Sequence, residues 1–149
     1  MLIYDTEVIK GIPNEEIIPN INYCKGWDDF VQMGISCLVF LWKDSTYVCT
    51  SMLLEKLNFT IDDLDIDSQC SIHYGFDMFR YAIANTDHIV GFNSKKFDDN
   101  LCKANGIEIT TTYDLLEQVR LAAYGSTDYL DMPKGYSYSL GKIAIAFYN

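Results

Sequence analysis

Hydrophobic positions fall into short, dense runs in the first part of the chain. Two runs rich in β-branched and aromatic residues, 33–42 and 47–53, flank the polar segment 43–46, and this pattern predicts an antiparallel hairpin. A shorter apolar run at 2–4 predicts a strand close to the start of the chain. Consecutive strands are usually neighbours, so we expect the hairpin to lie beside that first strand.

The spacing of apolar residues changes further along the chain. Phe76, Phe79 and Ile83 recur at helical intervals, which predicts a helix over about 75–85. Residues 8–29 carry glycine and proline with little periodicity and predict an irregular segment. The remaining elements are expected in alternation: a strand at 88–92, a helix at 97–104, a strand at 110–113, a helix capped by Asp114 and a last helix from Ser139.

Three strands followed by alternating helices and strands predict an α/β domain with a mixed five-stranded sheet flanked by helices. The hairpin supplies the antiparallel strands, and helical crossovers make the later strands parallel. This order of elements resembles a ribonuclease H-like fold. The 149 residues suit one domain, and no linker rich in Pro, Gly or Ser divides them.

Charge and cysteine content narrow the class of protein. The chain has 21 acidic and 11 basic residues, which argues against a broad basic face that binds nucleic acid. A cluster of carboxylates that meets phosphate through metal ions remains compatible with this charge. No apolar run has the length of a membrane span, and no secretion signal is visible at the N-terminus. Five cysteines, an odd number without a Cys-x-x-Cys pair, predict reduced thiols in the cytoplasm, with Cys37 and Cys49 in the core.

Asp5 and Glu7 form the first candidate site. They are separated by one residue on a predicted strand, so both side chains project to the same side. Two such carboxylates repel each other unless a cation or a proton relieves them. The pair fits a divalent metal site, and it also fits a polar strand end that faces water.

A second candidate lies where the strand at 89–92 passes through a turn into a helix. Asp98 falls in the first turn of that helix. Ligands of α/β sheets gather at the carboxyl ends of strands, so Asp98 is expected near Asp5 and Glu7 if the two strands are neighbours. A carboxylate in this position also suits the helix dipole, and Asp99 fits the same role. The choice between Asp98 and Asp99 depends on the rotation of the helix.

These motifs resemble a known family. Asp5-Thr6-Glu7 after an apolar run, with Val90-Gly91-Phe92-Asn93-x-x-x-Phe97-Asp98, resembles the first two motifs of DEDD-type 3′→5′ exonucleases of the ribonuclease H-like superfamily. Further stretches are similar to the branch of predicted exonucleases related to helicase-associated domains: Trp27–Phe30 leading to Met33–Ser36, Tyr113–Glu117, and Ser139–Ala144. They follow in the family's order and cover nearly the whole chain.

The resemblance implies a two-metal phosphodiesterase that uses Mg²⁺ or Mn²⁺ and removes nucleotides from 3′ ends of single-stranded DNA or RNA, with a helicase or replication protein as a possible partner. Asp5 would bridge both ions, Glu7 would bind one of them and Asp98 the other. One ion lowers the pKa of the attacking water, and the second stabilises the leaving 3′ oxygen. An all-carboxylate site with open water positions suits these ions.

Several neighbouring residues are expected to touch the nucleic acid. Asn93 would brace the turn or contact the nucleotide, although capping of the local backbone explains it equally well. The two lysines of the turn suit phosphates, or they are simply solvated. Asp114 is expected to cap its helix, with support of the site as a second role. The expected nucleic-acid contacts are Thr6, Asn93, Lys95, Lys96 and Phe97.

One part of the family's pattern is missing. The fourth acid of these exonucleases follows the stretch that matches Ser139–Ala144, and residues 145–149 contain no carboxylate. Asp128 and Asp131 precede the last helix and do not match that position. We therefore expect residues 1–149 to form one such domain without the C-terminal end of the last helix. A relocated ligand, or an inactive module that binds nucleic acid or protein, is the alternative.

Overall fold

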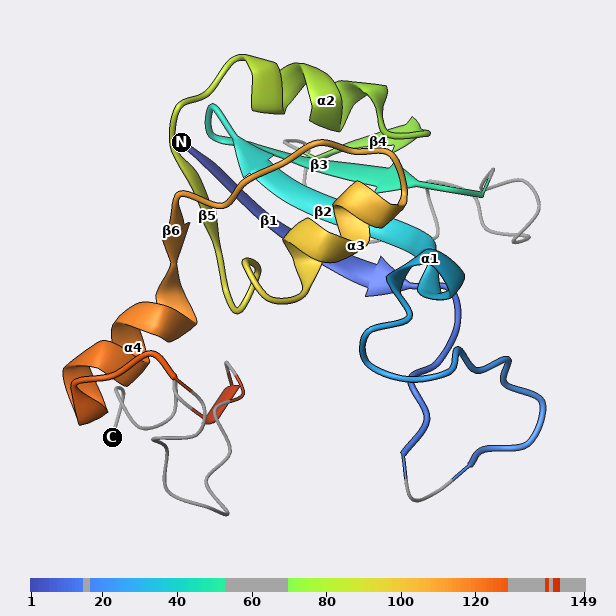
Figure 1. Cartoon of the computed structure of the whole chain (residues 1–149). Coiled ribbons are helices and arrows are strands. Elements are labelled where there is room, and N and C mark those ends of the chain that lie inside the picture. Colours follow the sequence, from blue (N-terminus) through green and yellow to red (C-terminus); the bar gives the residue numbers. More distant parts are fainter. Residues whose placement is uncertain (15–16, 53–69, 129–138, 140, 143–149) are drawn as a thin grey trace.

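The computed structural model describes residues 1–14, 17–52, 70–128, 139 and 141–142. This part of the chain forms a mixed six-stranded sheet flanked by helices (Figure 1). The strands are β1 (Leu2–Val8), β2 (Ile35–Trp42), β3 (Ser45–Thr50), β4 (Cys70–Tyr74), β5 (Ile89–Gly91) and β6 (Tyr113–Asp114). The helices are α1 (Phe30–Met33), α2 (Asp77–Ala84), α3 (Asp98–Ala104) and α4 (Leu115–Tyr124).

The sheet has the order β4-β3-β2-β1-β5-β6, with β1 in an interior position. β2 runs antiparallel to both β1 and β3, whereas β5 and β6 are parallel to β1. The predicted hairpin is therefore confirmed, and its turn is tight. Lys43 and Asp44 have φ values of 49° and 63°, the left-handed pair that matches the twist of a two-residue hairpin. The predicted α/β class with a mixed sheet is also confirmed.

The expectation of five strands was wrong. The sixth strand, β4, pairs in parallel with β3 at the edge of the sheet. Its sequence, Cys-Ser-Ile-His-Tyr, contains only one aliphatic residue, and none of its five residues is fully buried. Cys70, Ile72 and Tyr74 alternate with Ser71 and His73, which is the period of a strand. The pattern covers only five residues, and the sequence interpretation overlooked it.

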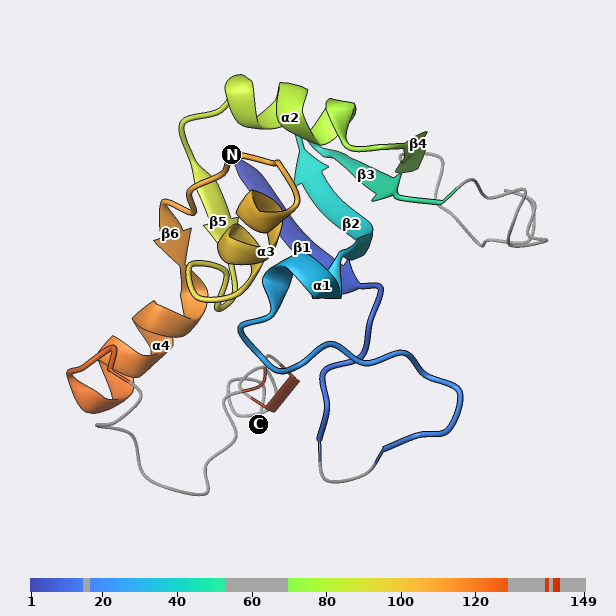
Figure 2. The ribbon, with the colours of Figure 1, turned by 45° about the vertical axis from the view of Figure 1, so that its right-hand side comes forward.

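Helices α1, α2 and α3 lie over one face of the sheet, as the two views in Figures 1 and 2 show. Leu2, Tyr4 and Phe40 point to this face, and the ring of Phe79 on α2 packs 5.1 Å from Phe40 and 5.5 Å from Tyr4. Burying a side chain of the size of Phe79 contributes roughly 1.5–3 kcal/mol. This packing fixes which side chains of β1 face the helices and which face away.

The helices over 75–85 and 97–104 are confirmed as α2 and α3, and Asp114 caps α4 as predicted, because its carboxylate accepts the N–H of Leu116 at 3.0 Å. The strand expected at 110–113 is shorter and later, at β6. The expected last helix lies outside the described residues except for 139 and 141–142.

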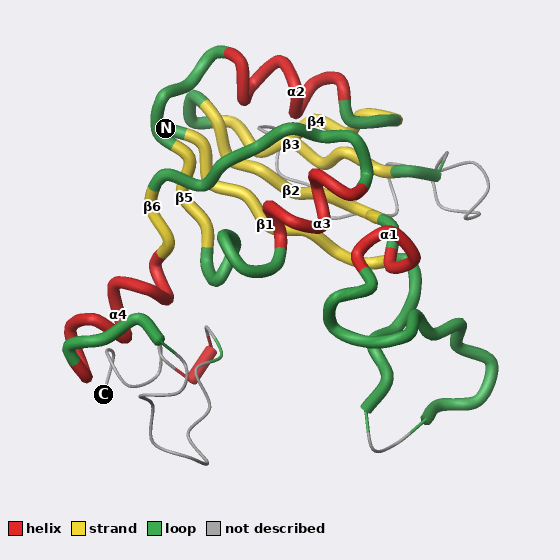
Figure 3. The backbone as a smooth tube through the Cα atoms, in the orientation of Figure 1, coloured by secondary structure: helices red, strands yellow, loops and turns green. Residues whose placement is uncertain are grey.

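The irregular segment expected over 8–29 is largely confirmed. The described residues between β1 and α1 form a long loop (Figure 3), with an isolated bridge between Gly11 and Tyr23. The short helix α1 at its end was not predicted, because four residues are too few to show helical periodicity.

The five cysteines are free thiols. Cys49 is fully buried, as expected, whereas Cys37 is only half-buried. Burial raises the pKa of Cys49 to about 11 and that of Cys102 to about 12. In the described ranges, none of the helices has both the length and the apolar character needed to cross a membrane.

Candidate functional site

Strand β1 separates its side chains onto two faces. Leu2, Tyr4 and Thr6 are buried against the helices, whereas Asp5 and Glu7 are exposed. The strict alternation follows from the pleat of the strand. β1 pairs with β2 on one side and with β5 on the other. Both carboxylates therefore stand at an interior strand of the sheet, on the same side of that strand.

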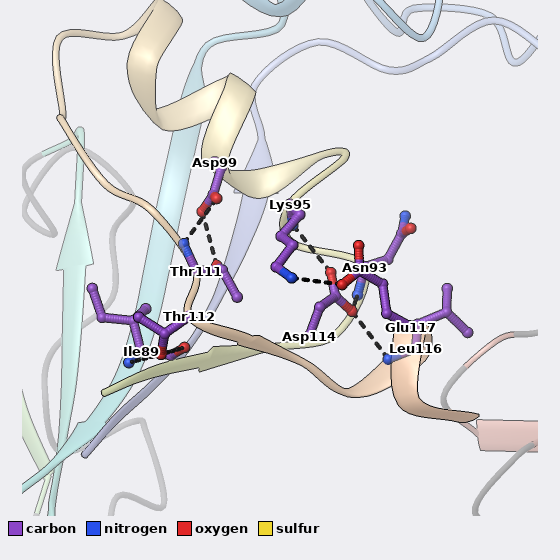
Figure 4. A network of polar contacts seen from close by, with 9 residues as sticks. All are labelled: Ile89, Asn93, Lys95, Asp99, Thr111, Thr112, Asp114, Leu116 and Glu117. Atoms are coloured by element: carbon purple, nitrogen blue, oxygen red, sulfur yellow. Dashed lines mark hydrogen bonds and ion pairs between the residues drawn. The ribbon is translucent and has the colours of Figure 1, made fainter. Parts of the chain in front are cut away.

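The turn from β5 to α3 is held by a single carboxylate. Asp114, only 1% exposed, accepts the backbone N–H of Asn93 at 2.8 Å and that of Lys95 at 3.1 Å, while it also caps α4 through Leu116 (Figure 4). Asn93 takes a left-handed conformation with φ of 62°, which asparagine tolerates better than most residues. Asp114 thus ties the turn to the start of α4.

Gly91 is the last residue of β5, directly before this turn. An added Cβ would overlap the side chain of Ser94, which is 1% exposed. The close approach lets the chain reverse directly into α3, and no side chain larger than hydrogen fits at this position without displacing Ser94.

We expect Gly91→Ala to lower the free energy of unfolding by about 2 kcal/mol, because overpacking at this contact must move the turn. Urea denaturation monitored by circular dichroism measures the change. Gly26→Ala is the matched control, since its added Cβ would lie 3.6 Å from the nearest atom, a carboxylate oxygen of Asp28. Equal stability of the two variants would show that the turn adapts freely.

The adjacent carboxylates Asp98 and Asp99 point in different directions, although both are 4% exposed. The hydroxyl of Thr6 donates a short hydrogen bond to Asp98. Asp99 instead accepts the N–H of Thr111 at 2.9 Å, its hydroxyl at 2.8 Å (Figure 4) and the hydroxyl of Tyr4 at 2.6 Å. The rotation of α3 therefore assigns Asp99 to the packing of the fold and leaves Asp98 beside β1.

The pKa of Asp98 is raised from its ordinary value of 3.8 to about 6. Burial is the largest cause and the negative charge of Asp5 adds to it, whereas the hydroxyls of Thr6 and Ser94 act in the opposite direction by stabilising the carboxylate. Two carboxylates thus approach each other closely enough to oppose ionisation. A cation between them would relieve this repulsion.

Asp5, Glu7 and Asp98 line one hollow of about 530 Å³. Sequence reasoning did not predict five of the other residues that line it, among them Trp27 and Arg120. Arg120 is 6% exposed and lies one helical turn after Leu116, which lines the same hollow. The remaining lining residues are Thr6, Phe92, Asn93, Phe97 and Ser139.

A second hollow of about 510 Å³ lies next to the first and shares Asp5 and Phe92 with it. Its lining is mainly apolar, with both aliphatic and aromatic residues, and includes Ile3, Val39 and Leu41 on the sheet face that points away from α2 and α3. The two hollows therefore join a polar and an apolar surface at Asp5.

The other residues expected to contact nucleic acid lie in different settings. Asn93 and Phe97 line the first hollow, and the Thr6 hydroxyl is engaged with Asp98. Lys95 forms an ion pair of 2.6 Å with Glu117, whose hydrogen bond raises the lysine pKa. Lys96 is exposed and is not part of the lining.

Comparisons with known proteins add no relative: no protein-family model matches the chain, and no curated protein matches it. A function must therefore be inferred from the residues of the hollow. The oxygen donors of Asp5, Glu7 and Asp98 suit Mg²⁺ or Mn²⁺. A cation would also relieve the repulsion between the negative charges of Asp5 and Asp98. Their positions are spread, however, because within the described ranges no three His, Cys, Asp or Glu side chains are close enough to hold one ion.

Proposed function

We propose that the chain is a metal-dependent 3′→5′ exonuclease of the ribonuclease H-like type, which hydrolyses the ends of single-stranded DNA or RNA. The observation that carries the proposal is the hollow that Asp5 and Glu7 of β1 line together with Asp98 of α3. The strand directions support it as well, since an antiparallel hairpin beside β1 and parallel strands beyond it are what the sequence resemblance implies.

Several residues of the hollow have a role in this proposal. Asp5, Glu7 and Asp98 would hold the ions, and the hydroxyl of Thr6 orients Asp98. Divalent ions bound there would lower the pKa of the attacking water and stabilise the leaving 3′ oxygen. Arg120 brings a positive charge to the same hollow, where it suits a phosphate of the substrate.

A second candidate is an inactive module of the same type that binds nucleic acid or protein. The spread of the carboxylates favours it, because no group of three metal-ligating side chains converges in the described part of the chain. The two candidates differ in hydrolysis and agree in binding, so one assay separates them.

The test uses single strands labelled at the 3′ or the 5′ end, incubated with the chain and Mn²⁺. We expect stepwise loss of nucleotides from the 3′ end, and a loss of activity of more than about 100-fold in Asp5→Asn, because even an indirect change at a metal site costs 10–100-fold. Asp44→Asn, in the hairpin turn where asparagine also tolerates a positive φ, is the matched control and should keep full activity.

Intact strands in the presence of measurable binding would favour the inactive module. Hydrolysis by Asp5→Asn at the parent rate would contradict the assignment of the hollow.

A further inference from the structure

Trp27 exposes an aromatic surface at the carboxylate hollow. Its side chain is 70% exposed, although tryptophan is on average among the more buried residues. The residue lies in the irregular segment that precedes α1, and it lines the same hollow as Asp5, Glu7 and Asp98. A large apolar ring is therefore exposed to solvent beside a hollow lined by three carboxylates.

The indole is held in place from one side. Its ring packs edge-to-face against Phe97, with centroids 6.0 Å apart and an angle of 69°. Phe97 packs in the same manner against Phe30 of α1 at 5.8 Å. These contacts join two segments that are far apart in the sequence and fix the indole next to the turn that carries Asp98, the chain neighbour of Phe97.

A nucleobase is the ligand that matches this surface. It is planar and stacks on an indole whatever its sequence, because every base offers an aromatic face. A free organic anion would meet the charges of three carboxylates, whereas a nucleotide would approach them through bound cations.

From this arrangement we infer that Trp27 is a stacking platform for a nucleobase of the substrate strand, beside the phosphate that faces Asp5 and Asp98. The inference rests on the proposed function, since it takes the hollow as the site of the phosphate. It assigns Trp27 a part in binding, and none in the bond-breaking step. Recognition is then independent of base sequence and requires an unpaired base, which fits a single-stranded end.

The kinetic test replaces Trp27 and follows hydrolysis of a single-stranded oligothymidylate. We expect Trp27→Ala to raise KM about tenfold while kcat changes less than twofold, and Trp27→Phe to lie between that variant and the parent. Tyr74→Ala is the matched control, because Tyr74 is 66% exposed on the edge strand β4, on the far side of the sheet from β5. An unchanged KM in Trp27→Ala would overturn the inference.

A binding test is independent of catalysis. The chain has two tryptophans, and Trp42 is 5% exposed, so the fluorescence of Trp42→Phe reports on Trp27 alone. With Ca²⁺ present, we expect oligothymidylate to quench this fluorescence and an abasic strand of equal length to leave it nearly unchanged. Equal quenching by both strands would overturn the platform.

The two proposals fail in different ways. Base-dependent quenching without hydrolysis by the parent chain would refute the exonuclease and keep the platform as part of a binding module. Hydrolysis without base-dependent quenching would refute the platform and keep the exonuclease.

Discussion

Replacing Asp98 with asparagine is expected to raise the free energy of unfolding at pH 7, in the absence of metal, by up to about 3 kcal/mol. The pKa of Asp98 is about 6 in the folded chain against an ordinary 3.8, and each pKa unit corresponds to about 1.4 kcal/mol. Asparagine removes the buried charge and keeps an oxygen that accepts the hydroxyl of Thr6. For a chain of this length, the gain corresponds to roughly 6–12 °C in Tm.

The pH dependence of this gain has a defined sign. Below pH 4 the carboxyl is protonated in both the folded and the unfolded chain, so parent and variant should have similar stability. As the pH rises from about 4 to 6, the unfolded chain releases the proton first, and the parent loses stability relative to Asp98→Asn. Above about pH 6 the difference should stay constant. Thermal unfolding in EDTA between pH 3.5 and 8 measures the curve.

Metal should stabilise the parent and not the Asp98→Asn variant. Millimolar Mn²⁺ is expected to raise the Tm of the parent, because an ion that binds only the folded chain stabilises it, and to leave Asp98→Asn unchanged. Asp44→Asn should respond as the parent does, since Asp44 lies in the hairpin turn. A parent that gains nothing from Mn²⁺ or Mg²⁺ would exclude a metal site formed by these carboxylates.

Replacing the neighbouring residue Asp99 should have the opposite effect on the free energy of unfolding. Asp99→Ala is expected to lower the free energy of unfolding by about 4 kcal/mol, because three donors from Tyr4 and Thr111 lose their buried acceptor. Urea denaturation gives the value from the shift in midpoint. Tyr4→Phe removes one donor and keeps the ring against Phe79, so it should cost only about 1 kcal/mol. An Asp99→Ala variant as stable as the parent would show that this network contributes little to the fold.

The contrast between Asp98 and Asp99 also shows how far the sequence could predict the site. Both residues lie in the first turn of α3, and the motif spacing restricts the choice to these two. Which of them lies beside Thr6 in the lining of the hollow depends on how α3 rotates when Leu101 and Cys102 pack into the core. That rotation is set by tertiary packing, and it cannot be predicted from the local helix propensity of the residues.

The fold was predictable where apolar residues form long runs. The segments of β2 and β3 have such runs, rich in β-branched and aromatic residues, and their turn residues are polar. β4 alternates apolar and polar residues over only five positions, and β6 consists of two residues, so pattern reasoning missed the first and misplaced the second. Trp27 reached the site for a reason that no periodicity reports: a loop places it against Phe97, seventy positions away in the chain.

The interior position of β1 has a consequence for how the chain folds during its synthesis on the ribosome. β1 is made before every other described element, yet one of its two partners, β5, begins only at Ile89. During synthesis β1 can pair with β2, and β2 with β3, as soon as these strands emerge, whereas the edge of β1 at Leu2 and Ile3 pairs only after β5 has been made. Closing such distant parallel pairs is slow compared with forming a hairpin. The nascent chain therefore exposes an unpaired edge of β1 at Leu2 and Ile3 until the segment of β5 has been synthesised.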